Sequence, residues 1–299
     1  MKIKTTPFLI LCLVMLLCPG HLDAVSVTSS IAEGTVRITS ECRRPCQGEM
    51  VKICIESPGP LSAVLFFDGR KYPFISDGER LRHFALIVLG VDMTPGTYDA
   101  VVRLRPSRGT PKDIRFKLAV SRGTFPSKRI GVARRFTSPT PADMQRIYRE
   151  KELLGRIYGA SVPGWLGNGG FVMPLKGKVT GVFGERRVFN ENVVSRHRGI
   201  DIRSPRGVAV KASNAGKVAL VRNLYFSGNT VIINHGIGLF SIYCHLSKSS
   251  VREGTLVDKG RIIGYTGSTG RSTGPHLHWG LRLVDEYADP QSMIYLSFD

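Results

Sequence analysis

Hydrophobic and polar residues alternate over short stretches in the first half of the chain. Residues 35–39 alternate between the two classes, residues 63–67 are continuously apolar, and residues 98–104 follow a Pro-Gly turn. Such stretches recur roughly every ten to fifteen residues with turn residues between them, which is the spacing of strands in a sandwich of two sheets. The pattern predicts a mainly β chain whose residues 25–125 form an immunoglobulin-like β-sandwich.

The pattern changes to a helical period after residue 126. Thr140, Pro141 and Asp143 form a helix start, with a capping hydroxyl, proline in the first turn and an acid three residues after the cap. Apolar residues at helical spacing follow, and glycine stands at position 159. The sequence therefore predicts a linker over residues 126–170 that contains a helix at 141–158, with its apolar stripe packed on a domain face.

Strand patterns return from residue 171 to the C-terminus. Residues 216–221, 229–233, 239–243 and 260–265 predict strands, and Asn234-His235-Gly236 predicts a hairpin turn. Residues 267–275 form a long loop of small residues. Residues 171–299 are therefore expected to form a second, antiparallel β domain that is large enough to bury its own core.

The net charge and the N-terminal residues indicate where in the cell the protein is expected. The chain has 299 residues and a net charge of +19, which favours binding to polyanions. Residues 1–24 have a basic start, a short apolar run and a final alanine, which is typical of a secretory signal peptide. Cys18 raises the alternative of a lipoprotein, but Leu17 stands where a small residue is needed. We expect a secreted, periplasmic or envelope protein, with a wall polymer rather than nucleic acid as its partner.

No internal stretch reaches the ~18 apolar residues that a membrane crossing needs, so no integral membrane span is expected. Four cysteines follow the predicted signal. Cys42, Cys46 and Cys54 lie close together in the sequence, which predicts one local disulfide in an oxidising compartment, with its pairing left open. Cys244 is expected to be a buried free thiol.

The histidines give the strongest indication of chemistry, because five of the seven lie between positions 197 and 278. His276 and His278 are two residues apart on a predicted strand, so both point to the same face. His197 and Asp201 enclose a glycine and precede a proline, which favours a loop that runs into a strand. Two histidines and a carboxylate, with one position left for water, are the composition of a catalytic zinc site.

Two more histidines remain for acid–base work beside such a metal. They are His245, at the end of a predicted strand, and whichever of His276 and His278 does not bind the metal. His235 is expected to be structural, because it lies in a hairpin turn.

Three segments together resemble the signatures of the LytM/lysostaphin-type zinc metallopeptidases, in order and in spacing. They are residues 197–201, 243–246 and 273–278, within a resemblance that covers residues 171–289. The resemblance implies His197, Asp201 and His278 as zinc ligands and His245 and His276 as catalytic residues. It also implies a compact antiparallel sheet with a groove over the metal, and peptide cross-links of bacterial peptidoglycan as substrate. Cys244 departs from the small residue that is usual in the family.

Two functions follow from these observations. The first is a secreted zinc endopeptidase that hydrolyses peptidoglycan cross-links. The alternative is a non-enzymatic wall-binding regulator that activates a separate amidase, because relatives of that kind share the fold but lack zinc ligands. All five implied residues are present here, which favours the enzyme.

Overall fold

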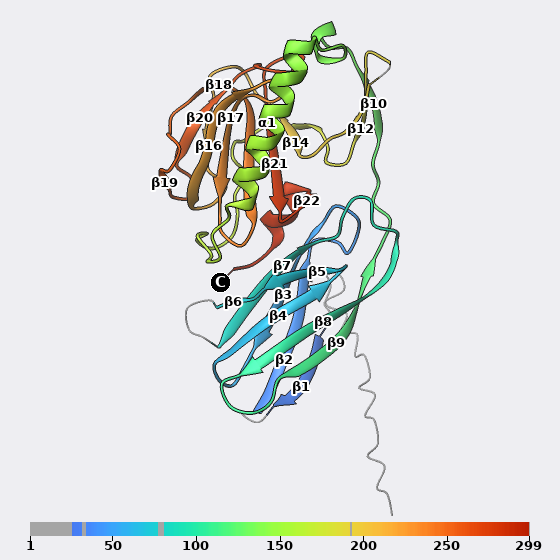
Figure 1. The fold of residues 1–299 in the computed structure, drawn as a ribbon, viewed down its shortest axis with the longest axis vertical. Helices are drawn as coiled ribbons and strands as arrows, with labels where there is room; N and C mark the ends of the chain where they lie inside the picture. Colours follow the sequence, from blue (N-terminus) through green and yellow to red (C-terminus); the bar gives the residue numbers. More distant parts are fainter. Residues whose placement is uncertain (1–25, 32–33, 77–80, 192, 299) are drawn as a thin grey trace, which may run out of the picture.

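The computed structural model describes residues 26–31, 34–76, 81–191 and 193–298. The predicted signal peptide, residues 1–24, lies outside the described residues. The rest of the chain forms a lower sandwich of strands and an upper β domain that carries one long helix (Figure 1). The prediction of a mainly β chain is confirmed.

The N-terminal domain is a sandwich of two antiparallel sheets. The first has the order β1 (Ser26–Ile31), β2 (Gly34–Cys42), β3 (Met50–Glu56), β7 (Arg82–Val88), β6 (Ile75–Ser76). The second has the order β5 (Arg70–Pro73), β4 (Leu61–Phe67), β8 (Gly96–Pro106), β9 (Lys112–Val120). Alternate residues of both sheets, such as Ile53, Leu65 and Val102, are fully buried in one core between them, as the alternating pattern predicts.

The disulfide expected in this domain is not formed, because Cys46 and Cys54 carry free thiols. The register of β2 on β3 explains why Cys42 and Cys54 do not pair. Cys42 lies opposite Val51, three residues along the strand from Cys54. Three residues of strand span about 10 Å, which exceeds the Cα separation of about 7 Å that a disulfide tolerates. Spacing in the sequence did not reveal this register.

The segment between the domains is more ordered than a connector. It contains β10 (Ser127–Ile130), the 3₁₀ helix η1 (Arg134–Phe136) and α1 (Pro141–Gly159). Thr140 and Asp143 exchange the two hydrogen bonds of a capping box at the start of α1. Strand β10 pairs in parallel with β12 (Arg186–Phe189), which pairs in turn with β13 (Val193–Arg196). The linker therefore supplies a strand to the C-terminal domain.

The C-terminal domain is built on a sheet whose main path runs β11 (Val179–Gly181), β14 (Ile200–Arg203), β21 (His276–Leu283), β18 (Leu239–Ser249), β17 (Gly228–Asn234), β16 (Gly216–Leu224), β19 (Leu256–Val257). Beside this path lie β15 (Ala209–Lys211), β20 (Ile262–Thr266), β22 (Glu286–Ala288) and the 3₁₀ helix η2 (Pro290–Tyr295). Every pairing in this sheet is antiparallel. Strand β21 thus lies between β14 and β18, and this order positions the site.

Helix α1 lies along the sheet in Figure 1 and packs its apolar stripe on it. Leu154, Ile157 and Tyr158 join a cluster with Leu220 and Phe240, and the rings of Tyr158 and Phe240 are 5.2 Å apart. The predicted packing of the helix on a domain face is therefore observed. Among the described residues, no helix has the length and apolarity that crossing a membrane requires.

The two domains share a polar contact that is shielded from water. Arg43 donates to Glu49, which is 2% exposed, and to Asp289 at 2.6 Å, so one guanidinium joins acids of both domains. Burial and the neighbouring Asp289 act to raise the pKa of Glu49, against the opposing effect of Arg43. Burial dominates, so the pKa of Glu49 is raised, and Arg43 supplies the positive charge that compensates this buried acid at the domain boundary.

We expect Arg43→Met to destabilise the protein by about 3 kcal/mol, because it leaves the Glu49 carboxylate buried without its main partner. The measurement is the free energy of unfolding in urea. Arg44→Met is the matched control, since the Arg44 side chain is 61% exposed and lies 3.7 Å from the same carboxylate. Equal losses for the two variants would contradict the role given to Arg43.

Candidate metal centre

Strand register brings the carboxylate and two of the histidines together. Asp201 of β14 lies directly opposite His278 of β21, and His278 lies opposite Cys244 of β18 on its other side. His276 precedes His278 by two residues on the same face of β21, whereas Leu277 between them is completely buried. The same-face geometry predicted for the pair is therefore observed.

His197 reaches the same place from the loop before β14. Gly199 allows this loop to approach β21 closely. A Cβ at position 199 would lie 2.9 Å from Nε2 of His278 and closer still to the carbonyl oxygen of Trp279. Only glycine leaves room for this approach.

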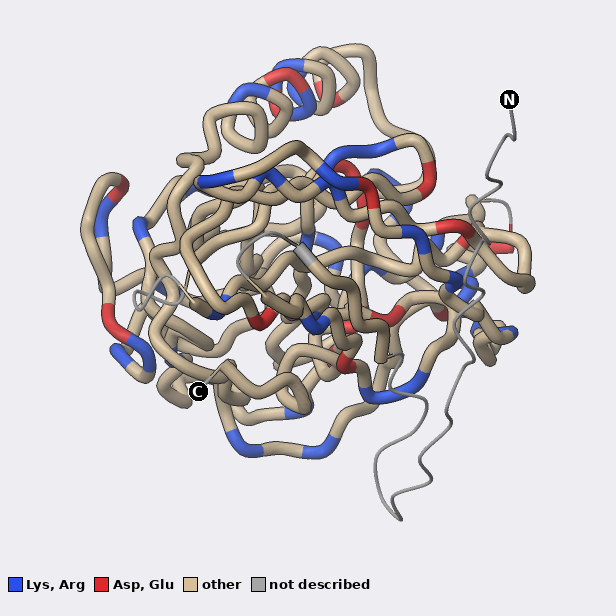
Figure 2. Tube along the Cα trace, turned by 90° about the horizontal axis from the view of Figure 1, so that it is seen from below, with Lys and Arg blue, Asp and Glu red and all other residues tan. Residues whose placement is uncertain are grey.

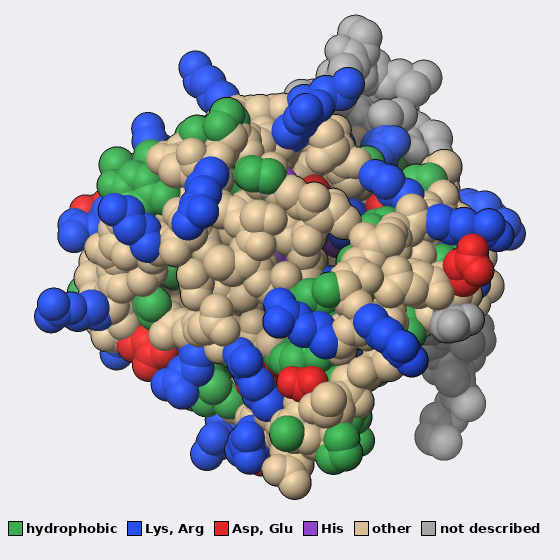
Figure 3. Space-filling view, turned by 90° about the horizontal axis from the view of Figure 1, so that it is seen from above, with side chains coloured by type: hydrophobic (Ala, Val, Ile, Leu, Met, Phe, Trp, Pro, Cys, Tyr) green, Lys and Arg blue, Asp and Glu red, His purple; other side chains and the backbone are tan. Residues whose placement is uncertain are grey.

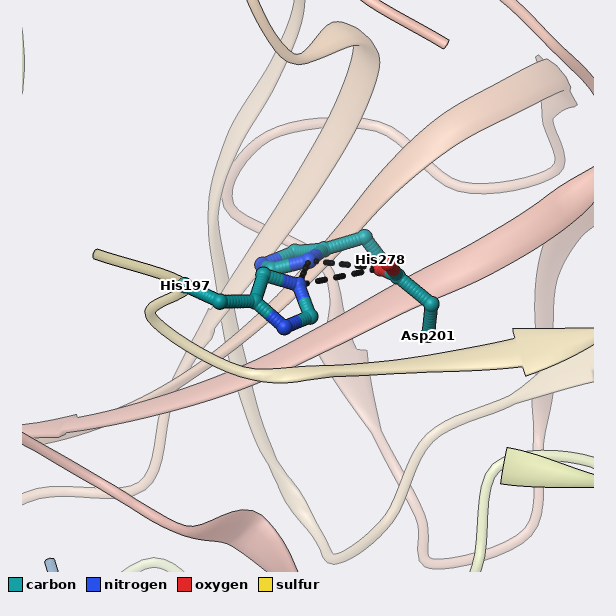
Figure 4. A group of neighbouring side chains, drawn as sticks. All are labelled: His197, Asp201 and His278. Atoms are coloured by element: carbon teal, nitrogen blue, oxygen red, sulfur yellow. Dashed lines mark hydrogen bonds and ion pairs between the residues drawn. The ribbon is translucent and has the colours of Figure 1, made fainter. Parts of the chain in front are cut away.

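Three donor atoms converge where these elements meet (Figure 4). His197 Nε2 lies 2.9 Å from His278 Nδ1 and 3.1 Å from Asp201 Oδ1, and the last two atoms are 3.1 Å apart. Ligands of a tetrahedral zinc ion with bonds of about 2.0–2.1 Å are separated by roughly 3.3–3.4 Å. The three atoms thus form one face of a slightly compressed tetrahedron, and the residues fit a metal ion.

Protonation supports the same interpretation. Nδ1 of His197 lies 2.8 Å from the carbonyl oxygen of Val182, which can only accept, and 3.0 Å from Nη2 of Arg187, which can only donate. With a metal on Nε2, the ring proton stands on Nδ1 and is donated to Val182 O. Burial opposes ionisation of Asp201, but its contacts with His197 and His278 hold the pKa of its carboxyl well below the ordinary value. Burial lowers the pKa of His278 to about 4. A cation among these atoms would relieve the repulsion between the Asp201 carboxylate and the His197 lone pair.

The second pair of predicted residues lies beside the first three. The rings of His245 and His276 are 4.8 Å apart, and Nε2 of His276 is 3.6 Å from Asp201 Oδ1. Nδ1 of His245 donates to the carbonyl of Thr269 at 2.7 Å, and Nδ1 of His276 donates to that of Gly274 at 2.8 Å. These bonds leave the Nε2 atom of each ring as the acceptor. The structure therefore brings together all five residues singled out in the sequence.

His245 adopts an unusual backbone conformation. Its φ is +61°, in the left-handed region, at a bulge where Cys244 and His245 together face Thr230 of β17. At the same point β18 leaves β21 and begins to pair with β20, starting at Leu246. A strained, bulged residue beside a cleft is typical of functional sites. Burial and the neighbouring histidines lower the pKa of His245 to about 3, so its ring is neutral at pH 7.

Arg187 and Glu185 belong to this centre but were not identified from the sequence. Nη2 of Arg187 donates to Asp201 Oδ2 at 2.6 Å, and its Nε donates to Glu185 at 2.7 Å. Glu185 is 5% exposed. The chain therefore fixes the second oxygen of the Asp201 carboxylate and leaves Oδ1 for the cluster. In the sequence, Glu185 and Arg187 are two charged residues in a polar stretch, and nothing there distinguishes a buried charge pair from charges at the surface.

His235 and Cys244 take no part in the cluster. His235 is completely buried and bonded to Ala215 O and Ser241 Oγ, so the structural role expected for it is confirmed. Cys244 is a buried free thiol, as predicted. Burial raises its pKa to about 12, and a protonated thiol is a poor metal ligand.

The five residues lie in a cavity of about 980 Å³. Its walls include β10 and α1 of the linker, the β12–β13 hairpin and the loop before β21. Figure 3 looks into this region and shows histidine and acidic side chains at the bottom of a hollow, with lysine and arginine side chains around it. A concave site of this size has room for a segment of an extended peptide beside the three converging donor atoms.

Comparison with known proteins shows which family the sequence of this region matches. Residues 195–290 match the model of peptidase family M23. The chain is 46% identical over 88 residues to peptidoglycan DD-endopeptidase ShyA of Vibrio cholerae serotype O1, covering 29% of this chain and 20% of that protein. It is 43% identical over 97 residues to DD-carboxypeptidase/endopeptidase Mpg of Neisseria meningitidis serogroup B, covering 32% of this chain and 22% of that protein. The chain thus matches about a fifth of the length of these relatives.

A solved structure resembles both domains. It is a crystal structure from Pseudomonas aeruginosa of a protein described as a candidate M23 peptidase, with 29% identity and a TM-score of 0.64. The alignment covers 84% of this chain and 96% of that chain, which is more than the C-terminal domain alone could supply. The arrangement of a β-sandwich, a linker and a sheet domain is therefore shared with that protein.

We expect Gly199→Ala to weaken binding of a divalent metal by about tenfold or more, because the added methyl group displaces His197 from His278. Gly155→Ala in α1 is the control, since a Cβ there meets nothing within 4 Å. The measurement is competition for zinc between the protein and a chelating dye. Unchanged affinity in Gly199→Ala would show that the loop does not set the distance between the histidines.

Proposed function

The C-terminal domain of this chain belongs to peptidase family M23, and on that premise we propose that the protein is a zinc endopeptidase that hydrolyses peptide cross-links of bacterial peptidoglycan. The observation that carries the proposal is the triangle of His197 Nε2, Asp201 Oδ1 and His278 Nδ1. Two imidazole nitrogens and a carboxylate oxygen are the ligand types that catalytic zinc takes, with a fourth position open.

Zinc held by these residues supplies Lewis acidity, which polarises a carbonyl and lowers the pKa of water. The chain's own residues prepare the site for it. Arg187 holds one oxygen of Asp201, and Val182 O can accept from Nδ1 of His197 in the tautomer whose Nε2 binds a metal. Preorganised donors reduce the reorganisation that binding requires.

His245 and His276 supply proton transfer in this proposal. Each ring is held through Nδ1 by a backbone carbonyl and presents Nε2 toward the cluster. A neutral Nε2 accepts a proton from the attacking water, and a protonated Nε2 donates to the leaving amine or to the developing oxyanion. Since the two rings are 4.8 Å apart, both can act on one bound peptide.

The surroundings support an anionic polymer of the cell envelope as the partner. Lysine and arginine number 42 against 23 acidic residues, and they are spread over the chain in Figure 2. Such a surface concentrates the protein on a negatively charged wall. With the signal-like N-terminus, we propose that the protein is secreted to the periplasm or envelope. The activities for which ShyA and Mpg are named support peptidoglycan peptides as substrates.

The alternative of a non-enzymatic regulator has less support. A regulator needs the groove but not the metal, so it does not account for the convergence of His197, Asp201 and His278 or for the strained backbone of His245. Both features act on chemistry rather than on adhesion.

We expect His197→Ala and Asp201→Ala to lose the metal and all hydrolysis, whereas His245→Ala and His276→Ala keep the metal and lose hydrolysis by at least about 100-fold. The first two variants lack a ligand, and the other two lack a proton carrier. The measurements are metal content of the purified proteins and release of muropeptides from cross-linked peptidoglycan, followed by mass spectrometry.

Chelation of the wild-type protein should abolish the release, and added zinc should restore it. A wild-type protein that holds no metal and leaves peptidoglycan intact while stimulating an amidase would establish the regulator instead. Normal cleavage by all four variants would refute the assignment of the site.

A further inference from the structure

Arg271 occupies a distinctive place in the wall of the cavity. Its guanidinium carbon lies 4.0 Å from the ring centre of Phe189 in β12 and 4.8 Å from that of Phe226, which follows β16. Two aromatic rings from separate elements therefore hold one guanidinium beside the metal centre. The catalytic scheme above gives this residue no role.

The charge of Arg271 is not balanced within the protein. Among the described residues, no carboxylate forms an ion pair or hydrogen bond with its side chain, whereas Arg187 pairs with Glu185 and Asp201, and Arg196 pairs with Asp92. Burial and the neighbouring Arg187 lower the pKa of Arg271 to about 10. Seven lysine or arginine side chains line the cavity, against the single carboxylate of Asp201. The cavity therefore has an excess of positive charge toward a ligand.

Arg271 is fixed relative to the two proton-carrying histidines. It lies in the loop 267–275, whose Thr269 carbonyl accepts from His245 and whose Gly274 carbonyl accepts from His276. The backbone N–H of Arg271 donates to Phe226 O at 2.8 Å. A ligand group bound by Arg271 is thereby held at a fixed place relative to the reacting peptide bond.

We propose that Arg271 binds a free carboxylate of the substrate and selects stem peptides that carry one over peptides in which it is amidated. The inference rests on the proposed function and deepens it. A guanidinium held against two aromatic rings can still present an edge for contact, and its parallel N–H groups match the two oxygens of a carboxylate. Contact with two rings also restrains the side chain, so less side-chain entropy is lost when a carboxylate binds.

A purely structural role would be different. In that case Arg271 would only clamp the 267–275 loop between the two rings, and its loss would affect all substrates alike. Substrate discrimination separates the two roles, because a clamp has no means of distinguishing a carboxylate from an amide.

The test compares two synthetic substrates, a cross-linked stem-peptide dimer with free carboxylates and the same dimer with its carboxylates converted to amides. For Arg271→Gln we expect kcat/KM to fall about 10- to 100-fold on the first and less than threefold on the second, since charge-assisted hydrogen bonds are lost only with the carboxylate. Arg271→Lys, which keeps a charge without the fork, should fall between wild type and Arg271→Gln on the first substrate. Arg252→Gln removes an exposed arginine outside the cavity and should match wild type.

A second measurement is independent of catalysis. Calorimetry on metal-depleted protein measures binding of a stem-peptide monomer with free carboxylates, and we expect Arg271→Gln to raise Kd about tenfold or more. Equal losses on both dimers, or an unchanged Kd, would overturn the proposal for Arg271. If the wild-type protein cleaves neither dimer, the proposed function fails, and the calorimetry still decides whether Arg271 binds a carboxylate. Thermal denaturation identifies any variant that is misfolded.

Discussion

The C-terminal domain depends on one electrostatic constraint, which is that three electron-rich atoms lie about 3 Å apart in a site shielded from water. His197, Asp201 and His278 present two nitrogens and a carboxylate oxygen to each other. Protons on the ring nitrogens allow hydrogen bonds between these atoms, but the three lone pairs that a metal needs would repel each other at this distance when they are desolvated. The arrangement persists because rigid neighbours hold each atom, and because a cation in their midst would convert the repulsion into binding energy. Polypeptides keep such costly arrangements where they serve chemistry.

The sheet supplies the required rigidity through its strand order. Strand β21 lies between β14 and β18, so Asp201, His278 and Cys244 are neighbours in consecutive strands. The backbone hydrogen bonds between β14 and β21 and between β21 and β18 then fix the backbone positions of Asp201 and His278. His245 differs, because it reaches the site through a bulge with a left-handed residue. The ligand positions are thus set by regular structure, whereas one proton carrier is set by a local irregularity.

The sequence predicted the residues that could bind a metal or transfer protons, but it did not predict the residues that hold them in place. Same-face placement of His276 and His278 follows from the period of a strand, and the pairing of those residues with Asp201 follows once β14 and β21 are neighbours. The roles of Arg187 and Glu185 could not be predicted, because the sequence does not show that these two charged side chains are buried and paired. The expected disulfide failed for a related reason, since proximity in the sequence does not determine the register of β2 on β3. Long-range register is the information that local patterns lack.

The linker and the C-terminal domain line one cavity together. A polar connector between domains would normally leave the groove open on both sides, but β10 pairs with β12 and α1 covers part of the sheet. Strand β12 also carries Phe189, one of the two rings that hold Arg271. The linker therefore packs against the strand that carries one ring of the wall beside Arg271. A C-terminal domain cut away at residue 171 would lose this strand pairing and the lining that β10 and α1 supply. The cavity is consequently a property of the linker and the C-terminal domain together.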